Sequence, residues 1–399
     1  MNIKTITMND FCSQVTDGTH DSPKQQGTGR FLITSKHLGK YALDFDSAKR
    51  ISEEDYQKII LRSKVDQWDI LFSMIGTIGN IYLETNADPQ YACKNVGIFK
   101  MGGDQEKAKW LYYYLQSPAG REYMITSARG TTQGYVPLGA LRNFPVEVPQ
   151  KEAREKISDF LWKIDEKIKT NEDINKNLEQ QAKTVLSHTL EDCRSSVPVH
   201  LGDYLYIKGR IGWKGLKKSE YLNHSDYRII NGESLTTSGI DWNKAGYISK
   251  ERYKESPEIM LQIGDILLSK DGTIGKIGYV DRLDSPTSVA SGIFVIRNTK
   301  PDIISTPFIY YLLKSSIFNA FVAGRTEGSV IPHLYQKDFM EFEFPLPSKI
   351  DMENFDDLIE PQFKMFFANQ VENEYLAKVR DSLLPKLMSG EIDVSNIDL

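Results

Sequence analysis

The sequence predicts an α+β fold. Two copies of one domain, each of mixed β-structure with short helices, are joined and separated by two long helices packed as an antiparallel coiled coil. The first observation behind this prediction is a repeat: residues 69–81 recur as residues 265–277, with nine of thirteen positions identical at a constant offset of 196. The second is that both copies alternate short apolar runs with turn residues. The third is that a long helical pattern follows each copy.

Three further anchors extend the repeat in the same order, at offsets of 195 to 197. They are Ile-Ser-x-Glu-x-Tyr at 51–56 and 248–253, Tyr-Tyr-Leu at 113–115 and 310–312, and Pro137 with Phe144 against Pro332 with Phe339. Colinear matches of this kind indicate a duplicated domain, and 399 residues suit two domains with connectors. We assign the copies to residues 1–150 and 197–348, a central helical spacer to 151–190 and a C-terminal helical spacer to 351–392.

Each copy is predicted to be mostly strand and turn. Its β-branched or aromatic runs lie between Gly, Pro, Asn and Asp, which is typical of short strands. In the first copy these runs are 31–34, 68–73, 96–99 and 144–148, and in the second they are 227–230, 265–269, 292–297 and 339–344. Amphipathic helices are expected at 105–117 and 305–315, each leading into a second helix that ends near Arg129 or Gly324.

The spacers have apolar residues at near-heptad spacing. In the first, the pattern runs from Ile157 to Val185 without Gly or Pro, which predicts a helix about 45 Å long. In the second, Pro361 predicts a kink or a separate first turn, and Pro385 with residues 389–390 predicts the end. Two such seams can bury each other as an antiparallel pair. The alternative is that each helix packs on its own domain.

Composition and charge narrow the function classes. No apolar run reaches the ~18 residues of a membrane span and no signal-peptide pattern is present, so a cytoplasmic protein is expected. Three widely separated cysteines favour reduced thiols over a disulfide frame or a zinc site. Residues 1–150 hold 17 basic and 16 acidic residues, residues 197–350 hold 19 and 17, and residues 351–399 hold 4 and 11. The near-neutral copies argue against a strongly cationic groove that grips phosphates alone.

Known catalytic motifs are missing from the sequence. The six histidines do not stand in HExxH or HxH spacing, and there is neither G-x-S-x-G nor the Asn-Pro-Pro-aromatic motif of adenine methyltransferases. Residues 76–79 and 272–275 both read Gly-Thr-Ile-Gly, without the Lys-Ser/Thr of a phosphate-binding loop. This block predicts a tight turn between strands. Whether the turn also donates backbone N–H or hydroxyl groups to a nucleic acid stays open.

Loops at corresponding places in the two copies are rich in side chains that contact base edges or phosphates. Their residues differ between the copies while the frame residues agree, as expected for two readers of different sequences. The alternative is polar loops without a ligand. The candidate DNA-binding residues are Thr19, His20, Thr77, Arg129, Thr131, Thr132, Gln133, Tyr135, Lys208, Arg210, Trp213, Lys214, Lys270, Thr273, Arg325, Thr326, Ser329 and His333.

In combination, these features resemble the specificity subunit (the HsdS family) of type I restriction–modification systems, over the whole chain. The motifs that carry the resemblance are Asp-Gly-Thr-His at 17–20, Gly-x-x-Gly at 76–79, Asn-Leu-Glu at 177–179, Gly-Arg-Ile-Gly-Trp at 209–213, Gly-Asp-Ile-Leu-x-Ser at 264–269 and the tail at 383–392. The first copy departs from the family pattern because Trp68 stands where the family has Gly before Asp69.

The resemblance implies a DNA-binding subunit without an active site, in which one target-recognition domain reads each half of a bipartite, asymmetric site. It implies double-stranded DNA and two methyltransferase subunits as partners, and motor/nuclease subunits that join through the complex, in a system of DNA methylation and bacterial defence. No cofactor or metal is expected on this chain; S-adenosylmethionine, ATP and Mg²⁺ are expected on the partner subunits. Two other classes stay open: a methyltransferase or nuclease with unrecognised motifs, and a scaffold that binds proteins only.

Overall fold

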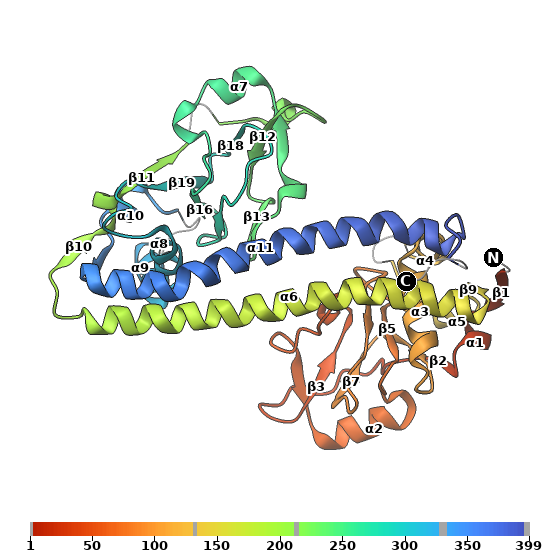
Figure 1. The fold of residues 1–399 in the computed structure, drawn as a ribbon. Coiled ribbons are helices and arrows are strands. Elements are labelled where there is room, and N and C mark those ends of the chain that lie inside the picture. Colours follow the sequence, from red (N-terminus) through yellow and green to blue (C-terminus); the bar gives the residue numbers. More distant parts are fainter. Residues whose placement is uncertain (1–2, 131–133, 211–214, 327–332, 395–399) are drawn as a thin grey trace. The chain divides into compact units, whose positions relative to one another are not determined.

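The computed structural model describes residues 3–130, 134–210, 215–326 and 333–394 (Figure 1). The chain divides into two compact units. Unit 1 comprises residues 1–171 and 371–399, and unit 2 comprises residues 172–370. Each unit therefore contains one duplicated domain together with a part of each long helix.

The domain of unit 1 contains a four-stranded antiparallel sheet in the order β2-β8-β5-β6 and a three-stranded sheet in the order β4-β3-β7. Strands β3 and β7 are parallel, and a separate antiparallel pair joins β1 to β9. The strands are β1 (Ile3–Thr7), β2 (Gln14–Asp17), β3 (Arg30–Ile33), β4 (Lys49–Ile51), β5 (Ile70–Ser73), β6 (Ile81–Leu83), β7 (Tyr91–Cys93), β8 (Val96–Lys100) and β9 (Pro145–Pro149). The helices are α1 (Met8–Phe11), α2 (Glu53–Ser63), α3 (Gln105–Gln116), α4 (Pro118–Ser127) and α5 (Leu138–Arg142).

The four-stranded sheet of unit 1 is buried on both faces. Successive side chains of a strand point to opposite faces. Ile70 and Phe72 of β5 accordingly join a core with Trp110 of α3 and with residues of both long helices. Leu71, between them, joins a second core with residues of β3 and β7. This explains why the first half of the repeated block is apolar without alternation.

Unit 2 repeats this arrangement. Its four-stranded sheet has the order β11-β19-β16-β17, its three-stranded sheet the order β15-β12-β18, and two pairs join β13 to β14 and β10 to β20. The strands are β10 (Pro198–His200), β11 (Leu205–Gly209), β12 (Tyr227–Ile230), β13 (Leu235–Thr236), β14 (Gly239–Ile240), β15 (Gly246–Ile248), β16 (Ile266–Ser269), β17 (Ile277–Tyr279), β18 (Thr287–Val289), β19 (Ile293–Asn298) and β20 (Glu343–Pro345). The helices are α7 (Lys250–Lys254), α8 (Thr306–Leu313), α9 (Ser316–Thr326) and α10 (Gln336–Met340).

A buried aspartate at the start of the repeated block has the same structural role in both units. Asp69 pairs with Lys100 of β8 at 2.7 Å, and Asp265 pairs with Arg297 of β19 at 2.6 Å. Burial raises the pKa of the Asp69 carboxyl. Because a buried carboxylate requires a partner, this position holds two strands together and is not free to contact DNA.

The residue before that aspartate adopts a left-handed backbone in both units. Gly264 has φ 95°, and Trp68 has φ 71°. A residue with a Cβ atom is strained there by roughly 1–2 kcal/mol. The Trp68 ring lies 6.3 Å from that of Trp162. This edge-to-face contact contributes to holding a side chain at a position where the second copy has glycine.

The two long helices, α6 (Lys151–Asp192) and α11 (Lys349–Met388), pack against each other as an antiparallel pair within each unit (Figure 1). In unit 1, Asn171 donates to Asn373 at 2.8 Å, and in unit 2, Asn369 donates to Asn175 at 2.9 Å. The predicted α+β fold with a coiled coil is confirmed.

Two sequence-based expectations are wrong, one about the C-terminal helical spacer and one about the second copy. Pro361 does not divide the C-terminal helix, because α11 runs through both Pro361 and Pro385 and ends at Met388. The missing proline N–H costs one hydrogen bond, but the buried neighbours Ile359 and Phe363 pack into the core of unit 2. The run 339–344 is not one strand either, since Phe339 belongs to α10 and only residues 343–345 form β20.

Candidate nucleic-acid interface

The candidate residues of unit 1 gather at one end of its four-stranded sheet. Strand β2 ends at Asp17, opposite Gly97, and β5 ends at Ser73, opposite Val96. Since β8 is antiparallel to both, the loop after β2, the turn after β5 and the residues before β8 leave the sheet at the same end. We call this end, residues 18–22, 74–80, 94–95, 129 and 134–135, the loop edge of unit 1.

The loop after β2 is held by hydrogen bonds that leave its polar groups near the surface. The exposed His20 contacts Asn95 at 2.8 Å through Nδ1 and Asp17 at 3.0 Å through Nε2. The Thr19 hydroxyl accepts a hydrogen bond from the Asp21 N–H at 3.1 Å. Both side chains therefore lie at the loop edge, where Thr19 is half-buried and His20 is exposed.

The repeated Gly-Thr-Ile-Gly block forms the predicted tight turn. Ser73 at the end of β5 donates its hydroxyl to the Thr77 carbonyl at 2.5 Å, and Ser269 donates to the Thr273 carbonyl at 2.7 Å. The serine closes the turn from inside, and both threonine side chains are exposed. Gly79 and its counterpart Gly275 have φ 93° and 90°, a conformation that favours glycine.

A second segment runs beside this turn in unit 1. Tyr135 forms β-bridges with Ile75 of the turn and with Arg129. Arg129 and Tyr135 are both exposed. The structure thus brings together residues that are about 60 positions apart in the chain, and they form part of the loop edge.

Unit 2 has a loop edge with the same frame. Strand β11 ends at Gly209, opposite Phe294, and β16 ends at Ser269, opposite Ile293. We define the loop edge of unit 2 as residues 208–209, 270–276, 291–292 and 333. As in unit 1, a residue from a later segment of the chain is bridged to the turn, here His333 to Asp271.

The side chains on the unit 2 loop edge differ from those on unit 1. Lys270 lies with its Nζ 5.0 Å from the centre of the Phe294 ring, and Lys208 lies 5.9 Å from the Tyr206 ring. His333 forms a hydrogen bond with the Asp271 carboxylate through Nδ1. The loop edge of unit 2 therefore carries two lysines and a histidine, whereas that of unit 1 carries His20, Lys94, Arg129 and Tyr135.

Two candidate residues of unit 2 have intramolecular partners. Arg210 is only 2% exposed, and its guanidinium donates to the Val289 carbonyl at 3.2 Å and to the hydroxyls of Ser256 and Ser288 at 3.4 Å. Burial lowers the pKa of Arg210. Arg210 is therefore held among groups of its own domain in this conformation, and its contact with DNA stays a prediction.

Arg325, near the end of α9, is exposed but paired with Asp338 at 3.3 Å and with Glu341 at 3.7 Å. Thr326 is the last residue of α9, and its side chain is outside the described part. Six other candidates also lie outside the described residues: Thr131, Thr132, Gln133, Trp213, Lys214 and Ser329. For these positions DNA contact stays a prediction.

Three polar residues at the unit 1 loop edge were missed from the sequence. Arg62, at the end of α2, donates to the carbonyls of Asp17 and Gly18 at 3.0 and 2.8 Å. Lys94 and Asn95 directly precede β8, and Asn95 has φ 53°. The Lys-Asn pair before a β-branched run is a turn signal that could have placed these two. Arg62 required the tertiary fold, because α2 is 45 residues from its partner.

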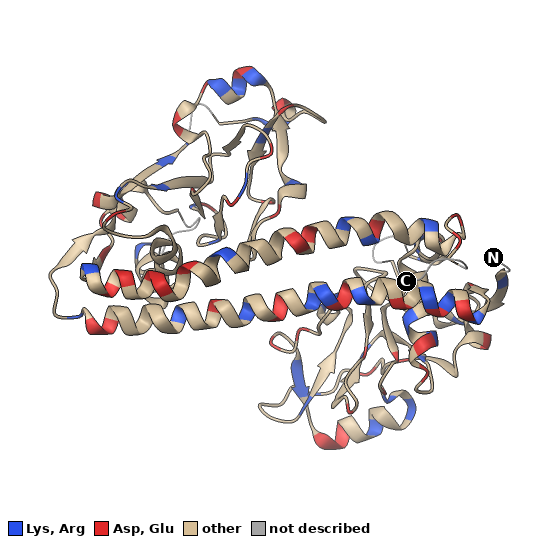
Figure 2. Cartoon of the chain, in the orientation of Figure 1, with Lys and Arg blue, Asp and Glu red and all other residues tan. Residues whose placement is uncertain are grey.

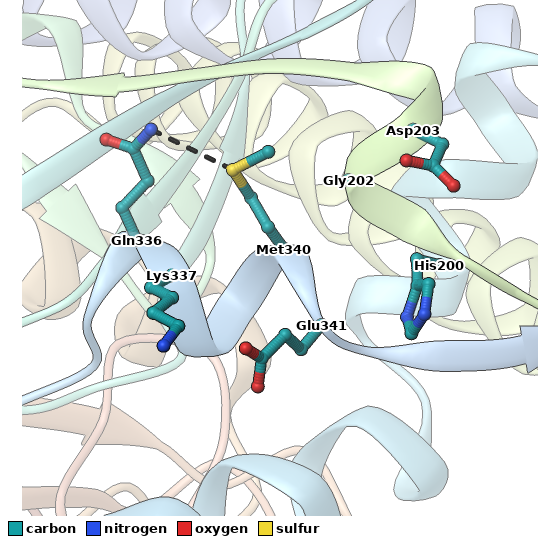
Figure 3. Close-up of a pocket in the computed structure, with 7 residues that line it drawn as sticks. All are labelled: His200, Gly202, Asp203, Gln336, Lys337, Met340 and Glu341. Carbon is teal, nitrogen blue, oxygen red and sulfur yellow. Dashed lines mark hydrogen bonds between the residues drawn. The ribbon is translucent and has the colours of Figure 1, made fainter.

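A separate hollow of about 510 Å³ lies beside α10 in unit 2 (Figure 3). Its ionisable lining residues are His200, Asp203, Lys337 and Glu341. Two carboxylates against one lysine do not favour a phosphate, and the hollow contains none of the candidate DNA-binding residues. We do not assign it a role in DNA binding.

Charge on both units is mixed, with blue and red segments alternating along α6 and α11 (Figure 2). Among the described residues, no group of three or more His, Cys, Asp or Glu side chains could hold a metal ion. Within the same residues, no helix is both long and apolar enough to cross a membrane.

Comparison with known proteins agrees with this geometry. A family model described as the type I restriction modification DNA specificity domain matches residues 25–180 and again residues 198–361. The MjaIX type I restriction enzyme specificity subunit of Methanocaldococcus jannaschii is 22% identical over 387 residues, covering 92% of this chain and 87% of the relative. The HindI specificity subunit of Haemophilus influenzae is 20% identical over 403 residues, covering 83% and 88%.

Among solved structures, the S subunit of a type I restriction–modification system from M. genitalium superposes with a TM-score of 0.59. The match covers 97% of this chain and 96% of that chain at 18% identity. At this identity the likeness concerns the fold: two domains with the same architecture, each associated with long helices.

Proposed function

Because the chain belongs to the family of type I restriction–modification DNA specificity domains, which matches both of its copies, we propose that it reads a bipartite, asymmetric DNA site with one domain for each half. As a specificity subunit it recognises the DNA target and has no catalytic role of its own. Family membership also decides against the two alternatives, an enzyme with unrecognised motifs and a protein-binding scaffold.

The observation that carries the proposal is the pair of loop edges. Their frames agree strand by strand, from the register of β5 with β8 and of β16 with β19 to the serine that closes each turn. Apart from the threonine that both turns expose, Thr77 and Thr273, the side chains on the two edges differ. Side chains that hydrogen-bond to the bases of DNA specify its sequence. Two loop edges with the same backbone frame but different side chains therefore suit two different half-sites.

A domain exchange tests this proposal. Residues 1–150 are replaced by the first domain of another family member, while Tyr41, Glu106, Lys109 and Tyr113 are kept because they contact α6. Sequencing of methylated adenines in cells carrying the complex should show new bases in one half of the site only. The matched chimera replaces residues 197–348 and keeps Lys314, which pairs with Glu179 at 2.6 Å. It should change the other half. If either chimera altered both halves, the model of one domain per half would be wrong.

The proposal extends to partners. Two methyltransferase subunits are recruited, and motor/nuclease subunits join through them; S-adenosylmethionine, ATP and Mg²⁺ belong to those subunits. The C-terminal segment supports this by its charge, because residues 351–399 hold 11 acidic residues against 4 basic ones. In unit 2, α11 exposes Asp357 beside the exposed Leu358. It also exposes Glu353 and Glu360, which pair with Lys349 at 3.8 Å and with Lys364 at 2.6 Å. An acidic surface with an apolar centre suits a protein partner with basic residues.

Changing these three acids to lysine should weaken co-purification of the methyltransferase by at least about tenfold, because attraction across the interface becomes repulsion. Analytical ultracentrifugation of the mixture measures it. Glu122→Lys, Asp104→Lys and Asp46→Lys, which lie in the domain of unit 1, form a control with the same change in net charge. Assembly that is equal in both variants would show that this acidic surface faces solvent.

A further inference from the structure

Unit 1 contains a buried polar cluster between its domain and both long helices. Asp165 of α6 is 5% exposed and Arg380 of α11 is 7% exposed, and Arg380 Nη1 lies 2.5 Å from Asp165 Oδ1. Tyr41 and Tyr113 of the domain donate to the same carboxylate at 2.7 and 2.8 Å. Lys40 stands 3.5 Å away. All of these groups belong to unit 1.

Positions in α6 correspond to positions in α11 that are 198 residues later in the sequence. The asparagines between the two helices show this correspondence. Asn171 plus 198 is Asn369, and Asn175 plus 198 is Asn373. The contact Asn171–Asn373 in unit 1 is therefore the counterpart of Asn369–Asn175 in unit 2. The asparagine pairs are the same in both units, so they can fix the register of the helices but cannot distinguish α6 from α11.

The polar cluster breaks this symmetry. By the same offset, Asp165 corresponds to Phe363 and Arg380 corresponds to Ala182. Phe363 packs against the rings of Tyr310 and Phe367 at 5.3 and 4.8 Å, and Ala182 is buried in the same core. Unit 2 thus fills with apolar side chains the positions that unit 1 fills with an ion pair.

This asymmetry affects how the helices can pair with those of a second copy of the chain. If α6 paired with a second α6 in the observed register, the asparagines would still meet. Asp165 would then face Ala182 of the other copy and would lose the arginine, keeping Lys40 of its own domain, 3.5 Å away, as its cation. In an α11–α11 pair, Arg380 would face Phe363 and would keep the neighbouring Asp381, at 2.8 Å, as its carboxylate. Breaking a buried ion pair is destabilising, whereas the α6–α11 pair keeps this one intact.

We infer that the Asp165–Arg380 pair selects the helix partner: it restricts α6 to α11 and prevents like helices of two copies from associating. A polar pair in an apolar seam adds little stability compared with well-packed apolar residues, so discrimination is the property it confers. The inference does not depend on which DNA sequence the domains read.

The test uses the full chain, folded and then cut. A site for a specific protease is inserted beside Val197, which is 84% exposed and follows α6. After cleavage, α6 remains on residues 1–196 and α11 on residues 197–399, and native mass spectrometry counts the assemblies. The natural sequence should give the 1:1 pair of unlike fragments. In Asp165→Leu with Arg380→Leu, like-fragment dimers should increase by roughly a hundredfold relative to the natural sequence, because no buried ion pair is left to break.

Two further variants keep the result interpretable. Asp165→Asn with Arg380→Gln removes the charges but keeps polar groups for Tyr41 and Tyr113, and decides the matter if the leucine variant fails to fold. Glu360→Gln with Lys364→Met neutralises one exposed acid and one exposed base of α11 and should leave only unlike pairs. If both neutral seam variants stayed unlike-paired, or if the natural sequence already formed like-fragment dimers, the inference would be overturned.

Discussion

Arg210 and Lys208 stand two residues apart at the end of β11 but have different surroundings. Arg210→Ala removes buried hydrogen bonds to Val289, Ser256 and Ser288 and should lower the stability of the chain by about 2–4 kcal/mol. Lys208→Ala, on the loop edge, should change stability by less than about 0.5 kcal/mol and weaken specific DNA binding of the assembled complex by about 1–3 kcal/mol. Thermal unfolding and DNA titration of both variants measure this. If the two variants lost the same stability, the assignment of Arg210 to a structural role and of Lys208 to the DNA-facing surface would be wrong.

His37 gives unit 1 a dependence on pH. Its buried ring accepts a hydrogen bond from the Thr34 N–H at 2.9 Å through Nδ1, and burial lowers its pKa. The unfolded chain therefore binds the proton first, so stability is lost as pH falls through the unfolded pKa of about 6.5. His37→Ala should lower the melting temperature at pH 7.5 and flatten its fall between pH 7.5 and 5.5, measured by calorimetry. Parallel curves for the two proteins would contradict this.

At the scale of elements, the sequence predicted what depends on local pattern. Strands β3, β5, β8 and β9, helices α3 and α8 and the turn at 76–79 lie where apolar period and turn residues placed them. Contacts between residues far apart in the sequence could not be predicted from local pattern. The burial of Arg210 depends on Ser256 and Ser288, 46 and 78 residues away. The passage of α11 through Pro361 likewise depends on core packing that outweighs one lost hydrogen bond.

The repeated turn permits a matched glycine comparison. Gly275 has φ 90°, and no atom would meet an added Cβ, so Gly275→Ala tests backbone strain alone. It should cost about 1–2 kcal/mol. Gly232 is also open to an added Cβ but is outside the left-handed region, and Gly232→Ala should be neutral or slightly stabilising. Urea unfolding of both variants gives the comparison; a neutral Gly275→Ala would mean that the turn relaxes freely.

For the whole molecule, the charge distribution sets how the chain binds DNA. Since neutralisation of phosphates supplies most non-specific affinity and both domains are near neutral, the isolated chain should bind DNA weakly and gain specific affinity with its methyltransferase partners. Gel-shift titrations at physiological salt, with and without methyltransferase, compare the two. Tight specific binding by the chain alone would show that the loop edges suffice.

We expect the length of the paired helices α6 and α11 to set the number of unread base pairs between the half-sites. Insertion in α6 alone would move Asn171 and Asn175 out of register, so both helices must be lengthened. Seven residues between 171 and 175 and seven between 369 and 373 add roughly 10 Å, or about three base pairs at 3.4 Å each. Mapping of methylated sites should show both half-sites unchanged with a longer unread spacer. An unaltered spacer with full activity would show that the helices do not set the distance.

The composition of unit 1 also has a consequence for synthesis on the ribosome. Leu384, Leu387 and Met388 are buried in the same core as Ile157 and Leu161 of α6, although they come more than 200 positions later in the chain. At a translation rate of about 5–20 residues per second, roughly 10–40 s pass between synthesis of the first domain and synthesis of these residues of α11, which complete its core. During that time the apolar face of α6 is uncovered on the nascent chain. Conditions that slow translation of the second domain should therefore cause misfolding that begins in the first.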